Sequence, residues 1–178
     1  NGNRQMRERE RMVEPVAWIG LIGILALIDL CLKELIEEQA DEEFPRALKG
    51  TGERIVLHKS YNRGFPFGFL KEKPELVKMI PVAAASAVFG ALAYLLGKKG
   101  HFAEKLAFSL TLGGAVSNLI DRYKRNHVVD YFSFNVRGLK KIIFNLGDLF
   151  IFAGMIILML AEASQFLRDI GKRAGTRR

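Results

Sequence analysis

Cysteine and histidine are scarce in this chain of 178 residues, which contains one Cys and three His. A single cysteine, Cys31, forms no intrachain disulfide, so a disulfide-stabilised scaffold is excluded. The histidines His58, His101 and His127 are too scattered in the sequence to predict a metal site. The chain also lacks the low hydrophobicity of a disordered protein, since hydrophobic residues make up 49% of it.

Acidic residues are fewer than basic ones. The chain has 19 Asp and Glu against 27 Lys and Arg, which gives a net charge of +8 and a pI near 9.7. Such a charge suggests a nucleic-acid-binding protein, which would present one basic, water-exposed face. The distribution of the apolar residues favours a different class of protein, and we expect no nucleic-acid partner.

Hydrophobic residues concentrate in four stretches. The stretches cover residues 15–28, 79–96, 106–120 and 142–167. A membrane-spanning helix needs about 20 mostly apolar residues, and none of the four shows the sustained polar face of a helix on a soluble protein. Only residues 79–96 approach this length unaided; the others do so only if Asp29, Asp121 or Asp148 lies at a membrane end. The sequence therefore predicts an all-α integral membrane protein with four transmembrane helices, in preference to four buried helices of a soluble protein.

The predicted spans form a single membrane domain over residues 1–178. They cover about residues 16–36, 77–97, 104–122 and 144–167. An even number of spans places both longer connections, 37–75 and 123–143, on the side opposite the two termini. Twelve Lys and Arg residues fall in the 35 residues of the tails and the short loop, against twelve in the 60 residues of the longer connections. Basic residues favour the cytoplasmic side, so we expect both termini there.

The longer connections contain two stretches typical of β-strands. Residues 53–70 combine β-type residues with glycine and proline, and residues 127–136 are rich in β-branched and aromatic residues. Because both lie on one side of the membrane, we expect them to pair into a small extracytoplasmic sheet. The basic N-terminal tail contains three glutamates, and no small-residue cleavage site follows the first apolar stretch, so we expect that stretch to be a retained span.

Ionisable residues near the span ends are candidate site residues, because a charge in a bilayer is costly. Asp29 and Lys33 are four residues apart and share one helix face, which predicts either an ion pair or a direct role in a site. Asn118, Asp121 and Arg122 occupy successive turns of the third span, and we expect a mutual polar clasp with a structural role. Small residues at 113–117 precede them and permit close helix contact.

Three aspartates are expected to converge at one membrane face. The third span ends and the fourth begins on the same side, which brings together Asp121, Asp130 and Asp148, with Asn118 and Asn145 beside them. Two carboxylates in a partly dry site do not both ionise cheaply, so one holds a proton while the other acts as a base. Such a pair can activate water against an amide and protonate the leaving nitrogen. The structural alternatives are a surface position for Asp130 and a helix-dipole role for Asp148.

Several motifs in this order resemble the lipoprotein signal peptidase family, also called signal peptidase II, as a divergent member. The segments are IDLCLK (28–33), YNRGFPFGFL (61–70), GGAVSNLIDR (113–122), HVVDYFSF (127–134) and FNLGD (144–148). The resemblance covers about residues 16–167. It implies four transmembrane helices with a small extracytoplasmic β-cradle.

The resemblance also implies an activity and the residues that perform it. Asp130 and Asp148 would be the catalytic dyad of an aspartic endopeptidase. Supporting or substrate-binding positions would be Asn118, Asp121, Arg122, Asn145, Asn62, Gly64, Asp29 and Lys33. The implied substrate is a prolipoprotein with a diacylglyceryl-modified cysteine, cut just before that cysteine. No metal or cofactor is implied, and we expect a monomer among membrane lipids, in a bacterial cytoplasmic membrane, with its site near the outer face.

Five positions depart from the family pattern: Leu30, Phe65, Pro66, Ser117 and Gly147. Ser117 replaces a glycine and Gly147 an alanine, and glycine costs about 1 kcal/mol of helix stability relative to alanine. Gly147 is therefore expected to loosen the start of the fourth span. These departures concern rate, substrate range and inhibitor sensitivity, and they leave an alternative: a paralogue with altered or lost activity that binds lipidated peptides without cleaving them.

Overall fold

Each of the four hydrophobic stretches lies wholly or mostly in a long helix of the computed structural model, which describes residues 2–64, 70 and 72–175. The helices are α1 (Gly2–Glu37), α2 (Pro74–Leu96), α3 (Phe102–Lys124) and α4 (Leu146–Gly175). Within the described residues, three segments are long and apolar enough to cross a membrane, namely Glu14–Glu37, Pro74–Leu96 and Leu146–Ile170. The expected architecture, four helices with a small sheet, is confirmed.

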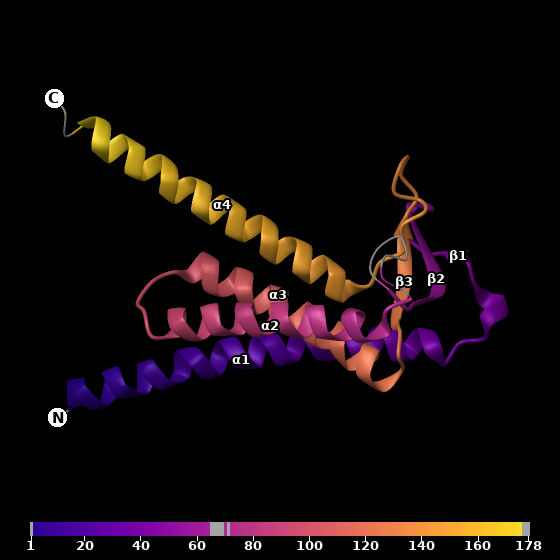
Figure 1. The fold of residues 1–178 in the computed structure, drawn as a ribbon, viewed down its shortest axis with the longest axis horizontal. Coiled ribbons are helices and arrows are strands. Elements are labelled where there is room, and N and C mark those ends of the chain that lie inside the picture. Colours follow the sequence, from indigo (N-terminus) through magenta and orange to yellow (C-terminus); the bar gives the residue numbers. More distant parts are fainter. Residues whose placement is uncertain (1, 65–69, 71, 176–178) are drawn as a thin grey trace.

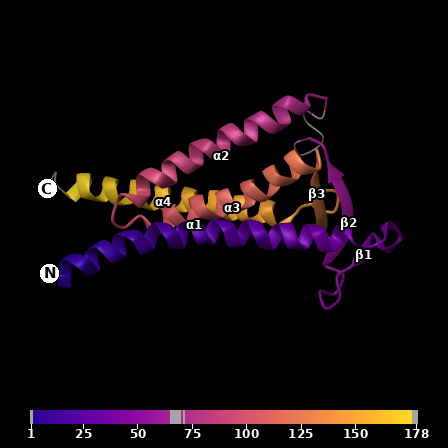
Figure 2. The same cartoon turned by 90° about the horizontal axis from the view of Figure 1, so that it is seen from below.

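Helix α3 is the central helix of the bundle. It contacts α1, α2 and α4 (Figures 1 and 2). Its buried side chains include five polar ones: Lys105, Ser109, Ser117, Asn118 and Asp121. Polar residues in a membrane helix are tolerated where they face the bundle interior, and α3 meets this condition because the other helices cover it. Its central position explains why it carries more polar residues than a helix that faces lipid.

Two adjacent glycines let α3 approach two different helices. A Cβ atom on Gly113 would lie 2.7 Å from the Cβ of Leu25 in α1. A Cβ atom on Gly114 would overlap the backbone carbonyl of Gly147 in α4. The close helix contact expected from the small residues at 113–117 is therefore confirmed, and it depends on the absence of side chains at these two positions.

A three-stranded antiparallel sheet lies at one end of the bundle, and α1 begins and α4 ends at the other (Figures 1 and 2). Its strands, in spatial order, are β1 (Arg46–Ala47), β2 (Ile55–Asn62) and β3 (Val128–Phe134). The two expected strands pair directly, with Asn62 opposite Val128. A short 3₁₀ helix (Asp41–Glu43) and β1 were not expected, because neither has an apolar pattern long enough to indicate an element.

Strand β3 is buried on both of its faces. Every residue from Val128 to Ser133 is buried, so the strand does not show the alternation of an exposed edge. Its core neighbours come from α1, β2, α4 and the segment before α4, and they include Ile36, Leu57, Phe144 and Leu149. Phe144 also forms a backbone bridge to Phe132. Asp130 is 5% exposed, which excludes the surface position considered for it.

Candidate active site

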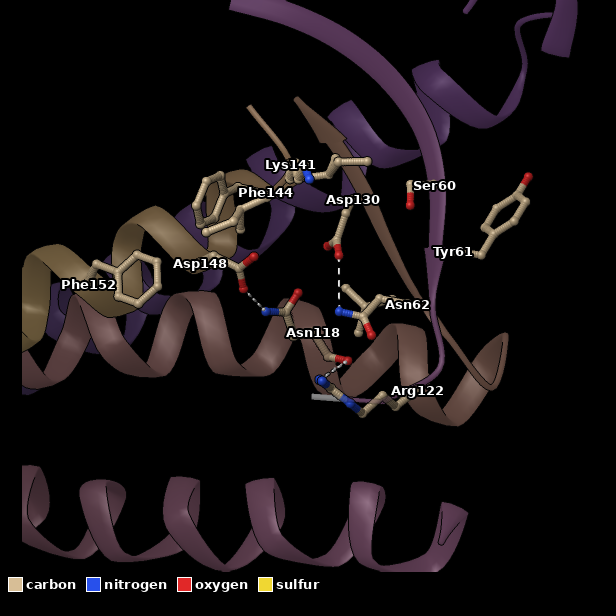
Figure 3. Close-up of a pocket in the computed structure, with 13 residues that line it drawn as sticks. Ser60, Tyr61, Asn62, Asn118, Arg122, Asp130, Lys141, Phe144, Asp148 and Phe152 are labelled. Atoms are coloured by element: carbon tan, nitrogen blue, oxygen red, sulfur yellow. Dashed lines mark hydrogen bonds between the residues drawn. The ribbon is translucent and has the colours of Figure 1, made fainter. Parts of the chain in front are cut away.

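Asp130 and Asp148 line one pocket between the sheet and the helices. Asp130 lies in the middle of β3 and Asp148 in the first turn of α4. Figure 3 shows both carboxylates turned toward the same space, with Asn118 and Asn62 beside them. The pocket has a volume of about 480 Å³, and its apolar lining is Val128, Ile142, Ile143, Phe144 and Phe152. This volume lies in the range of small-ligand and peptide side-chain sites.

Asp130 accepts a hydrogen bond on each carboxylate oxygen. Asn145 Nδ2 donates to Oδ1 at 2.8 Å, and Asn62 Nδ2 donates to Oδ2 at 3.2 Å. Burial and the nearby charge of Asp148 raise the pKa of Asp130, the two amide donors act in the opposite direction, and the net result is a pKa of about 7. Near neutral pH, this carboxyl group is therefore able to hold or release a proton.

Asp148 is positioned by reciprocal capping of α4. Asn145 Oδ1 accepts from the backbone nitrogen of Asp148 at 2.8 Å, and Asp148 Oδ2 accepts from the backbone nitrogen of Asn145 at 3.3 Å. This is the geometry of a capping box, in which two otherwise unpaired N–H groups at a helix start are satisfied. The other carboxylate oxygen, Oδ1, accepts from Asn118 Nδ2 at 2.9 Å. The cap that begins the helix thus also orients its acidic side chain.

Lys33 lies at the centre of a buried polar cluster next to the pocket. Its Nζ is 2.9 Å from Asp29 Oδ2 and 3.1 Å from Asp121 Oδ2, so the expected ion pair with Asp29 is present and a second one accompanies it. The same nitrogen donates to Ser117 Oγ at 3.0 Å and to Asn118 Oδ1 at 2.8 Å. Because Asn118 accepts from Lys33 through its oxygen, its NH₂ group is left to face Asp148.

Asp29 connects α1 to both elements that carry the pocket aspartates. Its Oδ1 accepts from Tyr131 Oη and from the backbone nitrogen of Leu146, both at 3.0 Å. Tyr131 follows Asp130 in the chain, and Leu146 is the first residue of α4. Asp29 therefore satisfies one of the free N–H groups at the start of α4 and holds that start against β3.

Asn62 of β2 and Arg122 of α3 line the pocket, and both bond to the backbone of Gly64. Asn62 Oδ1 accepts from the backbone nitrogen of Gly64 at 3.0 Å, while its Nδ2 faces Asp130. Arg122 donates to the backbone carbonyl of Asn118 at 3.4 Å (Figure 3) and to that of Gly64 at 3.5 Å. Phe65 and Pro66, two of the positions that depart from the family pattern, lie outside the described residues.

Comparison with known proteins identifies the family of this chain. The family described as Signal peptidase (SPase) II matches residues 21–164. A lipoprotein signal peptidase of Ralstonia nicotianae is 33% identical over 156 residues, which cover 85% of this chain and 86% of that protein.

This chain belongs to the signal peptidase II family.

Other relatives support the same assignment, and a solved structure shares the fold. A lipoprotein signal peptidase of Fusobacterium nucleatum is 35% identical over 156 residues, covering 83% of this chain and 86% of that protein. The relative in Clostridioides difficile is 38% identical over a shorter region of 107 residues, covering 59% and 69%. A solved bacterial membrane enzyme shares the fold, with a TM-score of 0.70 at 23% identity over 84% of this chain and 89% of that structure.

The clasp expected within α3 of this signal peptidase II member has a different form. Asn118 and Asp121 bond to other elements: Asn118 to Lys33 and Asp148, and Asp121 to Lys33 and to the backbone nitrogen of Val129 at 3.2 Å. Asp121 thus lies behind the pocket and anchors the start of β3 instead of lining the pocket with Asp130 and Asp148. The side chains of Asn118 and Asp121 thus pair with other elements, whereas Arg122 donates to the backbone carbonyl of Asn118 within α3.

Tyr131 is a functional candidate that sequence reasoning missed. Its ring belongs to the apolar core, but its hydroxyl donates to Asp29 and accepts from Leu146 N at 3.0 Å. Burial and the charge of Asp29 raise the pKa of this hydroxyl, which keeps it protonated as a donor. A sequence signal existed, since a tyrosine in a buried strand needs a partner for its hydroxyl. The identity of that partner depends on the tertiary fold.

Gly147 has a second role that the sequence did not indicate. A Cβ atom at this position would lie 2.8 Å from Asp29 Oδ2 and 3.1 Å from Asn145 Oδ1. The start of α4 is also fixed by the Asn145 cap and by Asp29. The expected loosening is therefore opposed by these contacts, and the absence of a side chain is what lets Asp29 reach α4.

Proposed function

We propose that this protein is an intramembrane aspartic endopeptidase that removes the signal peptide from diacylglyceryl-modified prolipoproteins. The cut is made immediately before the lipid-modified cysteine. The observation that carries the proposal is the pair Asp130 and Asp148, which line one pocket and are joined by the side chain of Asn145. Membership of the signal peptidase II family supports the substrate class, since the relatives named above are lipoprotein signal peptidases.

In the proposed mechanism the two carboxyl groups share one proton. The pKa of Asp130, near 7, keeps a proton in the pair at neutral pH. One carboxylate removes a proton from a water molecule that attacks the scissile carbonyl carbon, and the other group donates its proton to the departing nitrogen. The amide donors Asn62, Asn118 and Asn145 keep each carboxylate oriented toward the pocket. Because every step is a proton transfer or an attack by water, the proposed reaction uses no cofactor.

The proposed placement in the bacterial membrane follows from the apolar helices. Both termini lie in the cytoplasm, and the sheet, which is built from segments 37–75 and 123–143, lies near the outer face together with the pocket. The spans cover about residues 16–36, 77–97, 104–122 and 144–167 of one membrane domain, and the protein acts as a monomer. The higher density of Lys and Arg in the tails and the short loop supports this orientation. A lipid-anchored substrate then presents its scissile bond at the level of the aspartates.

The test is cleavage of a purified diacylglyceryl-prolipoprotein by the full-length protein in lipid bilayers. We expect the wild type to release a signal peptide and leave a lipid-modified cysteine as the new N-terminus, identified by mass spectrometry. Asp130→Asn and Asp148→Asn are expected to abolish cleavage. Asp169→Asn is the matched control, because Asp169 is an exposed acid on the same helix as Asp148. Retained cleavage by both dyad variants would contradict the aspartic mechanism.

The alternative, a paralogue that binds lipidated peptides without cleaving them, finds no support among the described residues. Both carboxylates keep their amide donors, and the pocket between them is open to a ligand. Substrate that binds to the wild type and stays intact would favour this alternative.

A further inference from the structure

Two of the positions that depart from the family pattern meet at a single carboxylate oxygen. Ser117 in α3 donates to Asp29 Oδ2 at 2.6 Å. On the other side of the same oxygen lies Gly147, where a Cβ atom would be only 2.8 Å away. The side chains of Asp29 and Ser117 are fully buried. A serine side chain thus lies on one side of the carboxylate oxygen, and a position without a side chain lies on the other.

The space filled by the Ser117 side chain and the space left free at Gly147 are complementary. Cβ atoms in folded proteins essentially never approach a non-bonded atom more closely than 3.0 Å, so alanine at position 147 requires Asp29 to move. Movement away from Gly147 is blocked, because Oδ2 is held by Ser117 Oγ and by Lys33 Nζ at 2.9 Å. A close-packed interior transmits such a conflict to its neighbours, since it contains little free volume.

The consequence reaches the pocket through the start of α4. Asp29 binds the backbone nitrogen of Leu146, and Gly147 lies between that residue and Asp148. Gly147 also contacts Gly114 of α3, where the two backbones pack without side chains. Any displacement of Asp29 or Gly147 therefore moves the helix turn that carries the Asp148 carboxylate.

We propose that Ser117 and Gly147 are a matched pair of positioning residues that act through Asp29 to set the location of Asp148. Ser117 fills space and directs the Asp29 carboxylate toward α4, and Gly147 leaves the room that this direction requires. Neither residue is among those that line the pocket. The expected effect on kcat rests on the proposed function, whereas the packing of Ser117 and Gly147 around Asp29 does not.

The test is a double-mutant cycle in the full-length protein, with cleavage of the diacylglyceryl-prolipoprotein measured as kcat and KM. Gly147→Ala is expected to lower kcat by about tenfold to a hundredfold, since small misplacements of a reacting group have effects of this size, with KM changed by less than about threefold. Adding Ser117→Gly frees space beside Asp29 and is expected to restore most of the lost kcat. Ser117→Gly alone is expected to have a smaller effect than Gly147→Ala.

Gly114→Ala is the matched control. Its added Cβ meets the backbone of Gly147 instead of Asp29, so Ser117→Gly is expected to leave its defect unchanged. Equal rescue of both alanine variants, or full kcat in Gly147→Ala, would overturn the inference. The thermal unfolding midpoint of each variant in bilayers provides a second measurement that needs no catalysis. If the wild type does not cleave the substrate, the proposed function fails, and selective recovery of the Gly147→Ala midpoint by Ser117→Gly still decides the pairing.

Discussion

Asn145 Nδ2 donates a hydrogen bond to Asp130 Oδ1 at 2.8 Å, and Asn145 Oδ1 accepts one from the backbone nitrogen of Asp148, in the first turn of α4. One side chain therefore relates the two acids, which come from a strand and a helix. Its two ends are not interchangeable, because the NH₂ group must face a carboxylate and the carbonyl must face a backbone N–H. The spacing of the acids is consequently set by a fully buried residue that carries no charge.

Replacing Asn145 with alanine is expected to affect stability and catalysis together. Loss of a helix cap costs about 1 kcal/mol of the free energy of unfolding. Loss of the donor to Asp130 is expected to lower kcat by at least about tenfold, because no shared side chain then fixes the position of one carboxylate relative to the other. Thermal unfolding and cleavage kinetics measure the two effects. Asn135→Ala is the control, since Asn135 is exposed, is not among the residues that line the pocket, and its side chain donates to the backbone carbonyl of Glu53. Unchanged kcat in Asn145→Ala would contradict the bridging role.

The charge of Lys33 is expected to be essential for folding. Lys33→Met leaves Asp29 and Asp121 buried without their shared cation, and removing one partner of a buried ion pair costs about 3–5 kcal/mol. The measurement is the thermal unfolding midpoint of the protein in bilayers. Lys140→Met, in an exposed loop, is expected to change the midpoint very little. A Lys33→Met protein as stable as the wild type would contradict this role of the Lys33 charge.

Tyr131→Phe isolates the contribution of one buried hydroxyl. The ring stays in the core, but Asp29 and Leu146 N each lose a partner at 3.0 Å, so we expect a loss of about 1 kcal/mol in unfolding free energy. Because these atoms position the start of α4, kcat is expected to fall while KM changes little. Tyr123→Phe is the matched control, because Tyr123 is 59% exposed. The same loss in both variants would argue against a specific role for the Tyr131 hydroxyl.

The raised pKa of Asp130 predicts a pH dependence of stability. Its pKa is about 7 in the folded protein, against about 3.9 in an unfolded chain. Between these values the folded protein holds a proton that the unfolded chain has lost, so this group stabilises the fold fully below pH 4. Its contribution decreases as the pH rises from about 4 to 7. Thermal unfolding midpoints of the wild type and Asp130→Asn across this window measure the effect, and the variant is expected to show a flatter profile. If the pH profiles of the wild type and Asp130→Asn run parallel, Asp130 is not the group whose pKa is raised.

Local patterns in the sequence determined the elements and most members of the candidate site. Long apolar runs specify helices, because a backbone in lipid must satisfy its polar groups by internal hydrogen bonds. A helix does this within a single segment. β-branched and aromatic residues similarly indicated β2 and β3 before any contact was known. The candidate acids followed from the cost of placing charge near a bilayer, and Asp130 and Asp148 do line one pocket.

Only the tertiary structure decided which groups bind one another. Lys33 meets Ser117 and Asn118 across more than 80 positions of sequence. Partners from other elements also bind Asn118 and Asp121, which the local spacing within α3 did not indicate. Likewise, the fit of Ser117 and Gly147 around Asp29 exists only when α1, α3 and α4 are packed. Composition and periodicity describe one segment at a time, whereas hydrogen-bond partners and free volume are properties of several segments in contact.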